Sequence, residues 1–239
     1  MNILVTGGAS GLGAAIVKKL AANAGNKVYF TYASSKSAAQ QMEADFPNCT
    51  SLHCDFSDAG SMDNFIAELA NTDIDILVNN ATGKIHKAHF YKTDPAVFLK
   101  SFETDVLATI RITQESIKLF RKKKFGKIIN IISSALINKP PIGWSGYVAN
   151  KAYLLSMSNS WATEYIRSNI TSNCISPSFM KTSLTSDTDE RIVQQMEDEH
   201  PLKKLLTTEE VADTVLFLTT ATQHINGINL IMNAGADLK

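Results

Sequence analysis

Short apolar runs that suit buried strands alternate with helical patterns along nearly the whole chain of 239 residues. The runs are rich in Ile and Val, as strands covered on both faces are. The segments between them repeat apolar residues at the spacing of one helix face. No internal repeat or linker interrupts this alternation, so the pattern predicts a single α/β domain, 1–239, built on a doubly wound, mostly parallel sheet. The strand candidates are 2–6, 27–32, 51–54, 74–79, 127–132, 170–175 and 227–232.

Composition narrows the class of protein. The 23 Lys and Arg residues balance 23 Asp and Glu residues, which gives no reason to expect nucleic acid or a membrane surface as partner. No apolar run approaches the length that crosses a bilayer, and the amino terminus carries no targeting pattern. Cys49, Cys54 and Cys174 lack metal-ligand spacing, and His86 and His89 lack a third ligand nearby. We therefore expect a cytoplasmic protein with reduced thiols and no metal site.

A glycine-rich turn, Thr6-Gly-Gly-Ala-Ser-Gly-Leu-Gly13, joins the first strand candidate to a helical pattern. In that context Gly7 allows a tight turn, Gly11 lets the backbone approach a diphosphate, and Gly13 lets the helix pack closely on the strand. The positive end of the helix would face the diphosphate. The spacing is GxxxGxG, and such turns are common, so the turn alone is a weak indication. It predicts a dinucleotide site with contacts from Gly7, Ser10, Gly11, Leu12 and Gly13.

The stretch after the second strand bears on the choice of dinucleotide. Many sites carry an acid there that binds the adenosine ribose diol, but the sequence from Tyr32 to Lys36 has none. The hydroxyl of Ser34 and the ammonium of Lys36 suit a 2′-phosphate, so we expect NADPH, with NAD as the alternative. Ser10, however, is not the additional basic residue that many NADP sites place in the glycine turn.

Asp55 and Phe56 follow the third strand candidate. The Asp55 carboxylate could accept a hydrogen bond from the adenine amine. It could equally belong to the start of the helix that Ser57 and Asp58 open. The sequence leaves both interpretations open.

The stretch from Ser134 to Lys151 carries the candidate chemistry. Ser134 falls at the carboxyl end of the 127–132 strand, the edge where ligands bind in open α/β sheets. Tyr147 follows 13 residues later, and Lys151 lies one helical turn beyond it. A hydroxyl, a phenol and an ammonium at this edge can polarise and protonate a carbonyl.

Taken together, TGGASGLG, Asn79-Asn80-Ala81, the spaced Ser134, Tyr147 and Lys151, and HINGINLIMNAG resemble the short-chain dehydrogenase/reductase family. The resemblance covers essentially the whole chain, and the nearest pattern is that of the 3-oxoacyl-(acyl carrier protein) reductases. It implies a Rossmann fold and an NADPH-dependent reductase of a ketone or 3-oxoacyl group.

The resemblance also implies roles for individual residues. Tyr147 would donate the proton, Lys151 would favour the phenolate and bind the nicotinamide ribose, and Ser134 would hold the substrate oxygen. Further cofactor contacts would come from Asn79, Ala81, Pro177 and Thr182.

Three positions depart from the family pattern. Asp105 stands where the family usually has the Asn of its proton relay, and Thr82 and Ser178 stand at usual glycine positions. A carboxylate at 105 could pair with Lys151, or bind backbone and water as the amide would. Two alternatives therefore stay open: an NAD-dependent dehydrogenase of a secondary alcohol or sugar, and a dinucleotide-binding subunit with weak or lost catalysis.

The segments 82–95, 136–146 and 178–204 would select the substrate, the last of them as a lid. A basic cluster ends the long helix predicted from Pro95 to Phe120; it is either a solvated helix end or a docking site for an acyl carrier protein. Its residues are Arg121, Lys122 and Lys124. Apolar residues of 95–120 and 147–165 permit the homodimer or homotetramer that the resemblance implies.

Overall fold

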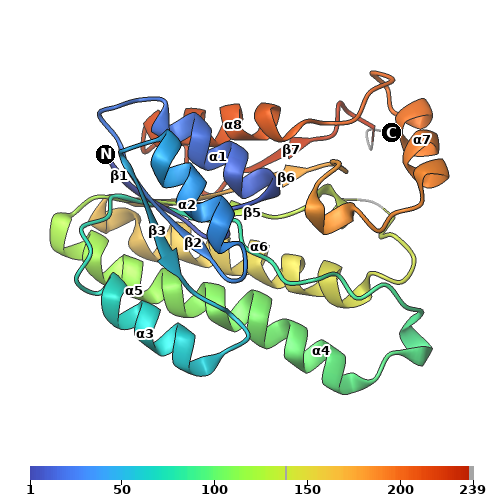
Figure 1. Cartoon of the computed structure of the whole chain (residues 1–239), viewed down its shortest axis with the longest axis horizontal. Coiled ribbons are helices and arrows are strands. Elements are labelled where there is room, and N and C mark those ends of the chain that lie inside the picture. The colour runs from blue at the N-terminus through green and yellow to red at the C-terminus, as the bar shows by residue number, and fades with distance from the viewer. Residues whose placement is uncertain (138, 237–239) are drawn as a thin grey trace.

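The computed structural model describes residues 1–137 and 139–236, and within them seven strands form one parallel sheet. The strand order is β3-β2-β1-β4-β5-β6-β7 (Figure 1). This confirms the doubly wound parallel sheet. Asn138, in the predicted substrate segment 136–146, and residues 237–239 of the predicted domain lie outside the described residues. The strands are β1 (Asn2–Val5), β2 (Lys27–Tyr32), β3 (Cys49–His53), β4 (Ile76–Asn79), β5 (Gly126–Ile131), β6 (Ile170–Pro177) and β7 (Asn229–Met232).

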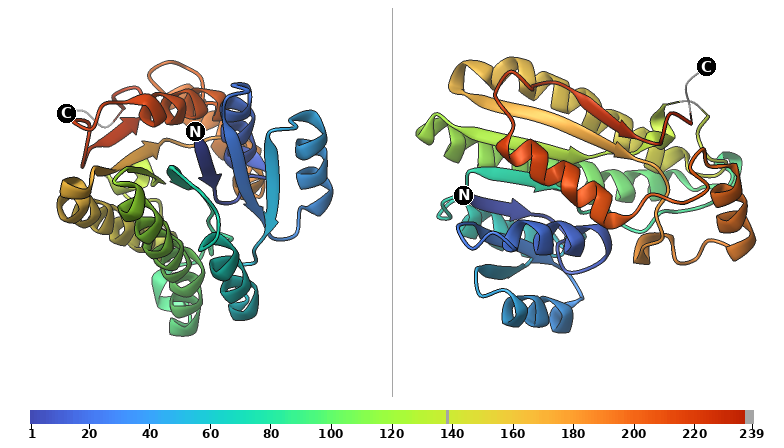
Figure 2. Two further views of the ribbon diagram at one scale, coloured as in Figure 1. Left: turned by 90° about the vertical axis from the view of Figure 1, so that its left-hand side faces the viewer. Right: turned by 90° about the horizontal axis from the view of Figure 1, so that it is seen from above.

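Helices cover both faces of the sheet (Figure 2). α1 (Gly11–Ala21), α2 (Lys36–Asp45) and α8 (Thr208–Thr220) pack on one face. α3 (Ala59–Leu69), α5 (Ala108–Lys123) and α6 (Ser145–Tyr165) pack on the other. Successive side chains of a strand point to opposite faces, so Ile3 and Val5 enter the first core and Leu4 enters the second. Double coverage explains why the strand sequences are nearly continuous apolar runs.

The chain reverses its winding direction at β1. This strand pairs in parallel with β2 on one side and with β4 on the other. In such sheets, ligands bind in the crevice beyond the carboxyl ends of the strands at this reversal. The glycine turn after β1, the 79–82 segment after β4 and the serines after β5 all lie at that edge, which brings the predicted site residues together.

The predicted long helix 95–120 is interrupted in the structure. α4 (Pro95–Phe102) leads into a π-helical turn, η2 (Glu103–Leu107), before α5 begins. Pro95 occupies the first turn, and Asp94 caps the helix by accepting from the Ala96 amide at 2.8 Å. Asp105 lies inside the π turn. Such turns occur often at functional sites, and apolar periodicity does not reveal them.

In the basic stretch 121–127, two lysines have bonded partners and three further cations form an exposed cluster. Lys127 is 5% exposed, and its ammonium donates to the Ala221 carbonyl at 2.5 Å, at the end of α8. Lys123 forms ion pairs with Asp73 and Asp75. Arg121, Lys122 and Lys124 are exposed, so the predicted cluster is present at the end of α5.

Within the described ranges, no helix combines the length and the apolar character needed to span a membrane.

Candidate active site

Tyr147 and Lys151 lie on one face of α6, a turn apart. The Lys151 Nζ is 5.8 Å from the centroid of the Tyr147 ring. Lys151 is 4% exposed, and its Nζ donates a hydrogen bond of 2.8 Å to the carbonyl oxygen of Ile131. Because Ile131 ends β5, this bond fixes the ammonium at the carboxyl edge of the sheet.

The hydroxyl of Tyr147 is hydrogen-bonded to Ser133, the residue that precedes the predicted Ser134. Ser133 follows β5 and caps the short helix η3 (Ser134–Leu136), where its Oγ accepts from the Ala135 amide at 3.2 Å. The predicted role of Ser134, to hold the substrate oxygen, stays a prediction. Both serines lie within three residues of the end of β5, so the structure places two hydroxyls at this edge of the sheet.

Burial dominates the electrostatics of the pair. It raises the pKa of Tyr147 above its ordinary value, opposed by the Ser133 hydrogen bond and reinforced by the negative charge of Asp105. Burial also lowers the pKa of Lys151 to about 8, and Asp105 opposes this change. Tyr147 therefore holds its proton at neutral pH, while Lys151 loses its proton at mildly alkaline pH.

Asp105 binds backbone and amide groups. One carboxylate oxygen accepts from the Gly83 amide at 2.6 Å and from the Thr82 hydroxyl at 3.3 Å. The other accepts from the side-chain amide of Asn150 at 3.3 Å. Of the two arrangements that the sequence leaves open, the structure shows backbone binding, because the Lys151 ammonium donates to Ile131 instead.

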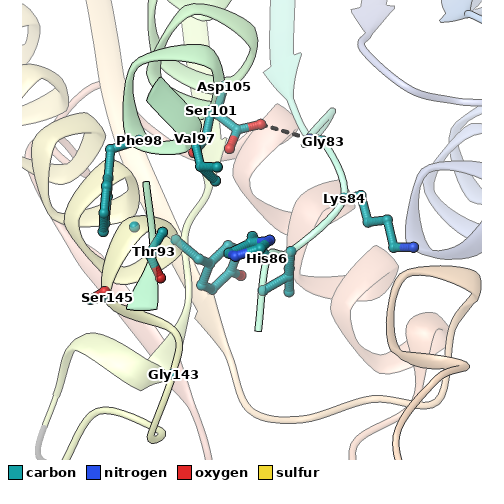
Figure 3. A pocket seen from close by; sticks show the side chains of 13 residues that line it. Gly83, Lys84, His86, Thr93, Val97, Phe98, Ser101, Asp105, Gly143 and Ser145 are labelled. Atoms are coloured by element: carbon teal, nitrogen blue, oxygen red, sulfur yellow. Dashed lines mark hydrogen bonds between the residues drawn. The ribbon is translucent and has the colours of Figure 1, made fainter. Parts of the chain in front are cut away.

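A small pocket opens beside Tyr147 and Asp105 (Figure 3). Its walls come from the loop after β4, from α4 and from the start of α6, with Ile85, Val97 and Phe98 as apolar lining. The loop after β4 is joined to the loop before α6 by a hydrogen bond of 3.2 Å from the Ala88 amide to the Gly143 carbonyl. Two of the three predicted substrate segments, 82–95 and 136–146, therefore meet at this pocket.

The glycine turn fits a dinucleotide diphosphate. A Cβ on Gly13 would lie 2.0 Å from the Gly7 carbonyl oxygen, so only glycine permits this approach. Gly11 has a φ of +51°, and Thr182 lies over it, with its Cβ 3.5 Å from where a Gly11 Cβ would be. Ser10 is at the N-cap of α1 but forms no side-chain cap bond, which leaves the first-turn amides without that partner. Amides of this kind bind anions.

The 79–81 segment packs against the glycine turn. The Asn79 side chain points into the core, where it donates to Thr113 at 3.0 Å and to Asn130 at 2.9 Å. A contact of Asn79 with the cofactor stays a prediction, and with this side-chain position it would come from the backbone. Ala81 does lie at the turn, 3.1 Å from a Cβ placed on Gly7. Asn80, which the sequence interpretation passed over, donates to the Thr6 carbonyl at 2.9 Å.

The residues predicted for the adenosine half lie around the ends of β2 and β3. Ser34 and Lys36 are exposed beyond β2. Asp55 accepts from the Ser57 amide at 2.9 Å and from the Ser57 hydroxyl at 2.7 Å, and these bonds lower its pKa. Asp58, not Asp55, caps α3. Phe56 packs partly against the core, and a contact of Asp55 or Phe56 with adenine stays a prediction.

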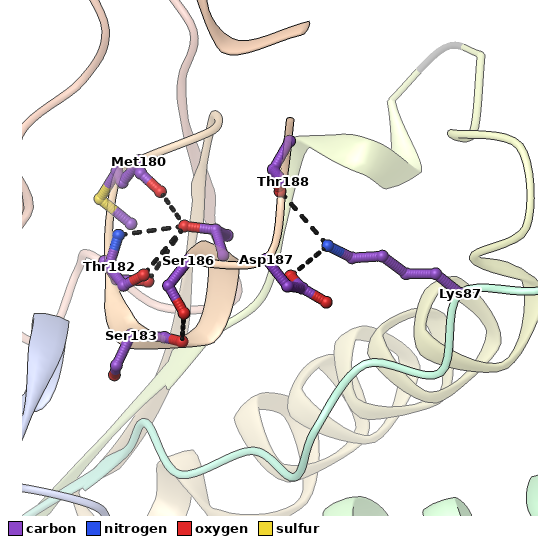
Figure 4. A network of polar contacts seen from close by, with 8 residues as sticks. Lys87, Met180, Thr182, Ser183, Ser186, Asp187 and Thr188 are labelled. Atoms are coloured by element: carbon purple, nitrogen blue, oxygen red, sulfur yellow. Dashed lines mark hydrogen bonds and ion pairs between the residues drawn. The ribbon is translucent and has the colours of Figure 1, made fainter. Parts of the chain in front are cut away.

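The predicted lid 178–204 is tied to the loop after β4 (Figure 4). It follows Pro177 and contains η5 (Ser183–Thr185) and α7 (Glu190–Glu199). Lys87 donates to Asp187 at 2.6 Å and to the Thr188 hydroxyl at 3.3 Å. These contacts join two segments that lie 100 residues apart in the sequence.

Comparisons with known proteins agree with this architecture. The family described as enoyl-(acyl carrier protein) reductase, a group of short-chain dehydrogenases, matches residues 7–237. The chain is 30% identical to 3-oxoacyl-(acyl-carrier-protein) reductase of Aquifex aeolicus, covering 97% of this chain and 95% of that protein. It is 32% identical to carbonyl reductase family member 4 of Xenopus laevis, covering 98% and 97% of the two chains.

A solved structure of a short chain dehydrogenase/reductase family protein superposes with a TM-score of 0.89 at 29% identity, over 100% of this chain and 98% of that one. With the glycine turn, the Tyr147–Lys151 pair and the full-length match in view, the chain belongs to the short-chain dehydrogenase/reductase family and is an oxidoreductase.

Proposed function

We propose that this oxidoreductase uses NADPH to reduce a ketone or a 3-oxoacyl group, with Tyr147 as the proton donor. The observation that carries the proposal is the buried Tyr147 phenol, which is hydrogen-bonded to Ser133 and lies beside the fixed Lys151 ammonium. A general acid must hold its proton at the working pH. Because burial raises the pKa of Tyr147, the site favours proton donation, and so reduction, over proton removal.

Reduction of a carbonyl places a hydride on carbon and a proton on oxygen. A bound dihydronicotinamide supplies the hydride, and the protein supplies the position and the charges. The substrate oxygen would lie between the hydroxyls of Ser133 and Tyr147. The proton moves from the Tyr147 oxygen to the substrate oxygen, and the Lys151 ammonium stabilises the phenolate that remains. The glycine turn, Ala81 and Thr182 would hold the dinucleotide.

The preference for NADPH rests on the residues beyond β2. No carboxylate ends this strand, and Ser34 and Lys36 are exposed beyond it, where a 2′-phosphate would bind. Phosphate recognition by a lysine is a charge-assisted interaction.

The named relatives support the substrate class, because they reduce 3-oxoacyl and carbonyl compounds by name. The apolar wall of Ile85, Val97 and Phe98 suits an acyl or alkyl chain, and the lid 178–204 would close over it. Docking of an acyl carrier protein on the basic cluster would involve a second copy of the chain. The ion pairs of Lys123 with the residues before β4 put that cluster at the opposite edge of the sheet from Tyr147. A carrier seated there would serve the site of a neighbouring copy in a homo-oligomer.

We expect the purified protein to oxidise NADPH in the presence of a 3-oxoacyl thioester, followed as loss of NADPH absorbance. The thioester is presented free and linked to an acyl carrier protein, with the double variant Lys122→Glu, Lys124→Glu as the probe of docking. A selective loss on the linked substrate would assign the cluster to the carrier. Turnover of only secondary alcohols or sugars with NAD would contradict the reductase and favour an NAD-dependent dehydrogenase. Nucleotide binding without any turnover would contradict it and favour a dinucleotide-binding subunit.

Ser133→Ala should lower kcat roughly 100-fold, because it removes a hydrogen bond to the charge that develops on the substrate oxygen. Ser134→Ala is the matched control, one residue away in η3, and should leave kcat about unchanged. Steady-state kinetics of both variants with the same ketone decide the point. A larger loss in Ser134→Ala would return the role to Ser134.

Lys36→Ala should weaken NADPH binding roughly tenfold, the effect of losing one hydrogen bond to a charged group, and leave NADH binding unchanged. Fluorescence titration with each nucleotide measures both. Lys18→Ala, which removes an exposed lysine of α1, serves as the control. Equal weakening for both nucleotides would show that Lys36 does not read the 2′-phosphate.

A further inference from the structure

Asp105 is a buried carboxylate to which no cation of residues 1–137 and 139–236 is bonded. It is 8% exposed and lies in the π turn between α4 and α5. Both of its oxygens accept hydrogen bonds, from the Gly83 amide on one side and from Asn150 on the other. Asn150 precedes Lys151 in α6 and also donates to the Ser101 hydroxyl of α4 at 2.7 Å. The Gly83 loop, the π turn and α6 therefore meet at the Asp105 side chain.

We propose that Asp105 is a positioning residue for the reaction. It ties the Gly83 loop to α6 through Asn150, and its negative charge balances the buried Lys151 ammonium. The kinetic part of this inference rests on the proposed reductase function, whereas the electrostatic part does not.

The tie consists of hydrogen bonds that the two Asp105 oxygens accept from different segments. A carboxylate offers acceptors on both oxygens, which matches an amide N–H from the loop and an amide NH₂ from α6. Gly83 lines the pocket beside Tyr147, so this tie sets the distance between the pocket wall and the phenol. An Asn side chain at position 105 could still accept from the Gly83 amide through its oxygen. Its NH₂ would then face the NH₂ of Asn150, and these two donors form no hydrogen bond unless the Asn150 amide flips.

The charge acts on Lys151 without contact. The titratable groups around the ammonium are Tyr147 on its own helix, Cys174 on β6 and Asp105 on η2. Burial raises the pKa of Cys174 to about 11, so this thiol is neutral at physiological pH, as is the Tyr147 phenol. Lys84 and His86 line the pocket that Asp105 also faces, on its solvent side. The Asp105 carboxylate is then the negative charge among these groups, and it favours the protonated form of Lys151.

The test is the titration of Lys151 in Asp105→Asn, followed by NMR of protein labelled at the lysine 13Cε, with Lys151→Met to assign the signal. No substrate is needed. We expect the midpoint, about 8 in the natural sequence, to fall by about 1 pH unit. Glu103→Gln removes an exposed carboxylate from the same π turn and should leave the midpoint in place. An unchanged midpoint in folded Asp105→Asn would overturn the electrostatic role; Asp105→Ser is the second neutral variant if Asn prevents folding.

The pH dependence of turnover separates this role from a merely structural one. Lys151 must be protonated to act, and its ammonium is lost as pH rises through its pKa. At saturating substrate, where a change of KM has no effect, the kcat of Asp105→Asn should therefore match the natural protein near pH 6 and fall several-fold below it near pH 8. A loss of the same size at both values would contradict the proposal.

Asn150→Ala tests the tie on its own. It removes the donor and keeps the Asp105 charge, so KM should rise several-fold while the Lys151 midpoint does not fall. An unchanged KM would overturn the tie. If the natural protein reduced no carbonyl at all, the proposed function would fail, and the NMR titration would still decide the role of the Asp105 charge.

Discussion

The hydrogen bond from the Lys151 ammonium to the last carbonyl of β5 is the contact on which the site depends. It places a cation inside the protein, where burial disfavours charge and lowers the pKa to about 8. A lysine with this pKa is charged at neutral pH but only by a small margin. The helix that carries it also carries Tyr147, so the position of the phenol follows from the position of the ammonium.

The fold provides this arrangement because a parallel sheet brings the ends of distant strands to one edge. The turn after β1, the segment after β4 and the serines after β5 lie beside one another through the strand order. The π turn at 103–107 then brings the Asp105 carboxylate within hydrogen-bond distance of the Gly83 loop. At a position where the family usually has an amide, this chain has a carboxylate, and Asn150 supplies the matching donor.

The sequence was sufficient for the sheet, the strands and the Tyr147–Lys151 pair, because these follow from apolar periodicity and from helical spacing. It was insufficient where geometry depends on irregular backbone. The spacing through the loop between β5 and α6 pointed to Ser134 and gave no signal for the hydrogen bond between Ser133 and Tyr147. The Asn79 side chain turned inward because Thr113 and Asn130 offer buried partners, which lie far from it in the sequence. The π turn and the Lys87–Asp187 contact likewise join elements that no local pattern connects.

The central claim is that the Tyr147 hydroxyl donates the proton while the rest of the site binds and orients. The most direct measurement is a single-turnover experiment on Tyr147→Phe with prebound NADPH and a reducible ketone, alongside a fluorescence titration with NADPH. The account predicts NADPH binding within about threefold of the natural protein and hydride transfer slowed by at least roughly 100-fold. Hydride transfer at the natural rate in this variant would show that the proton comes from elsewhere and would contradict the account.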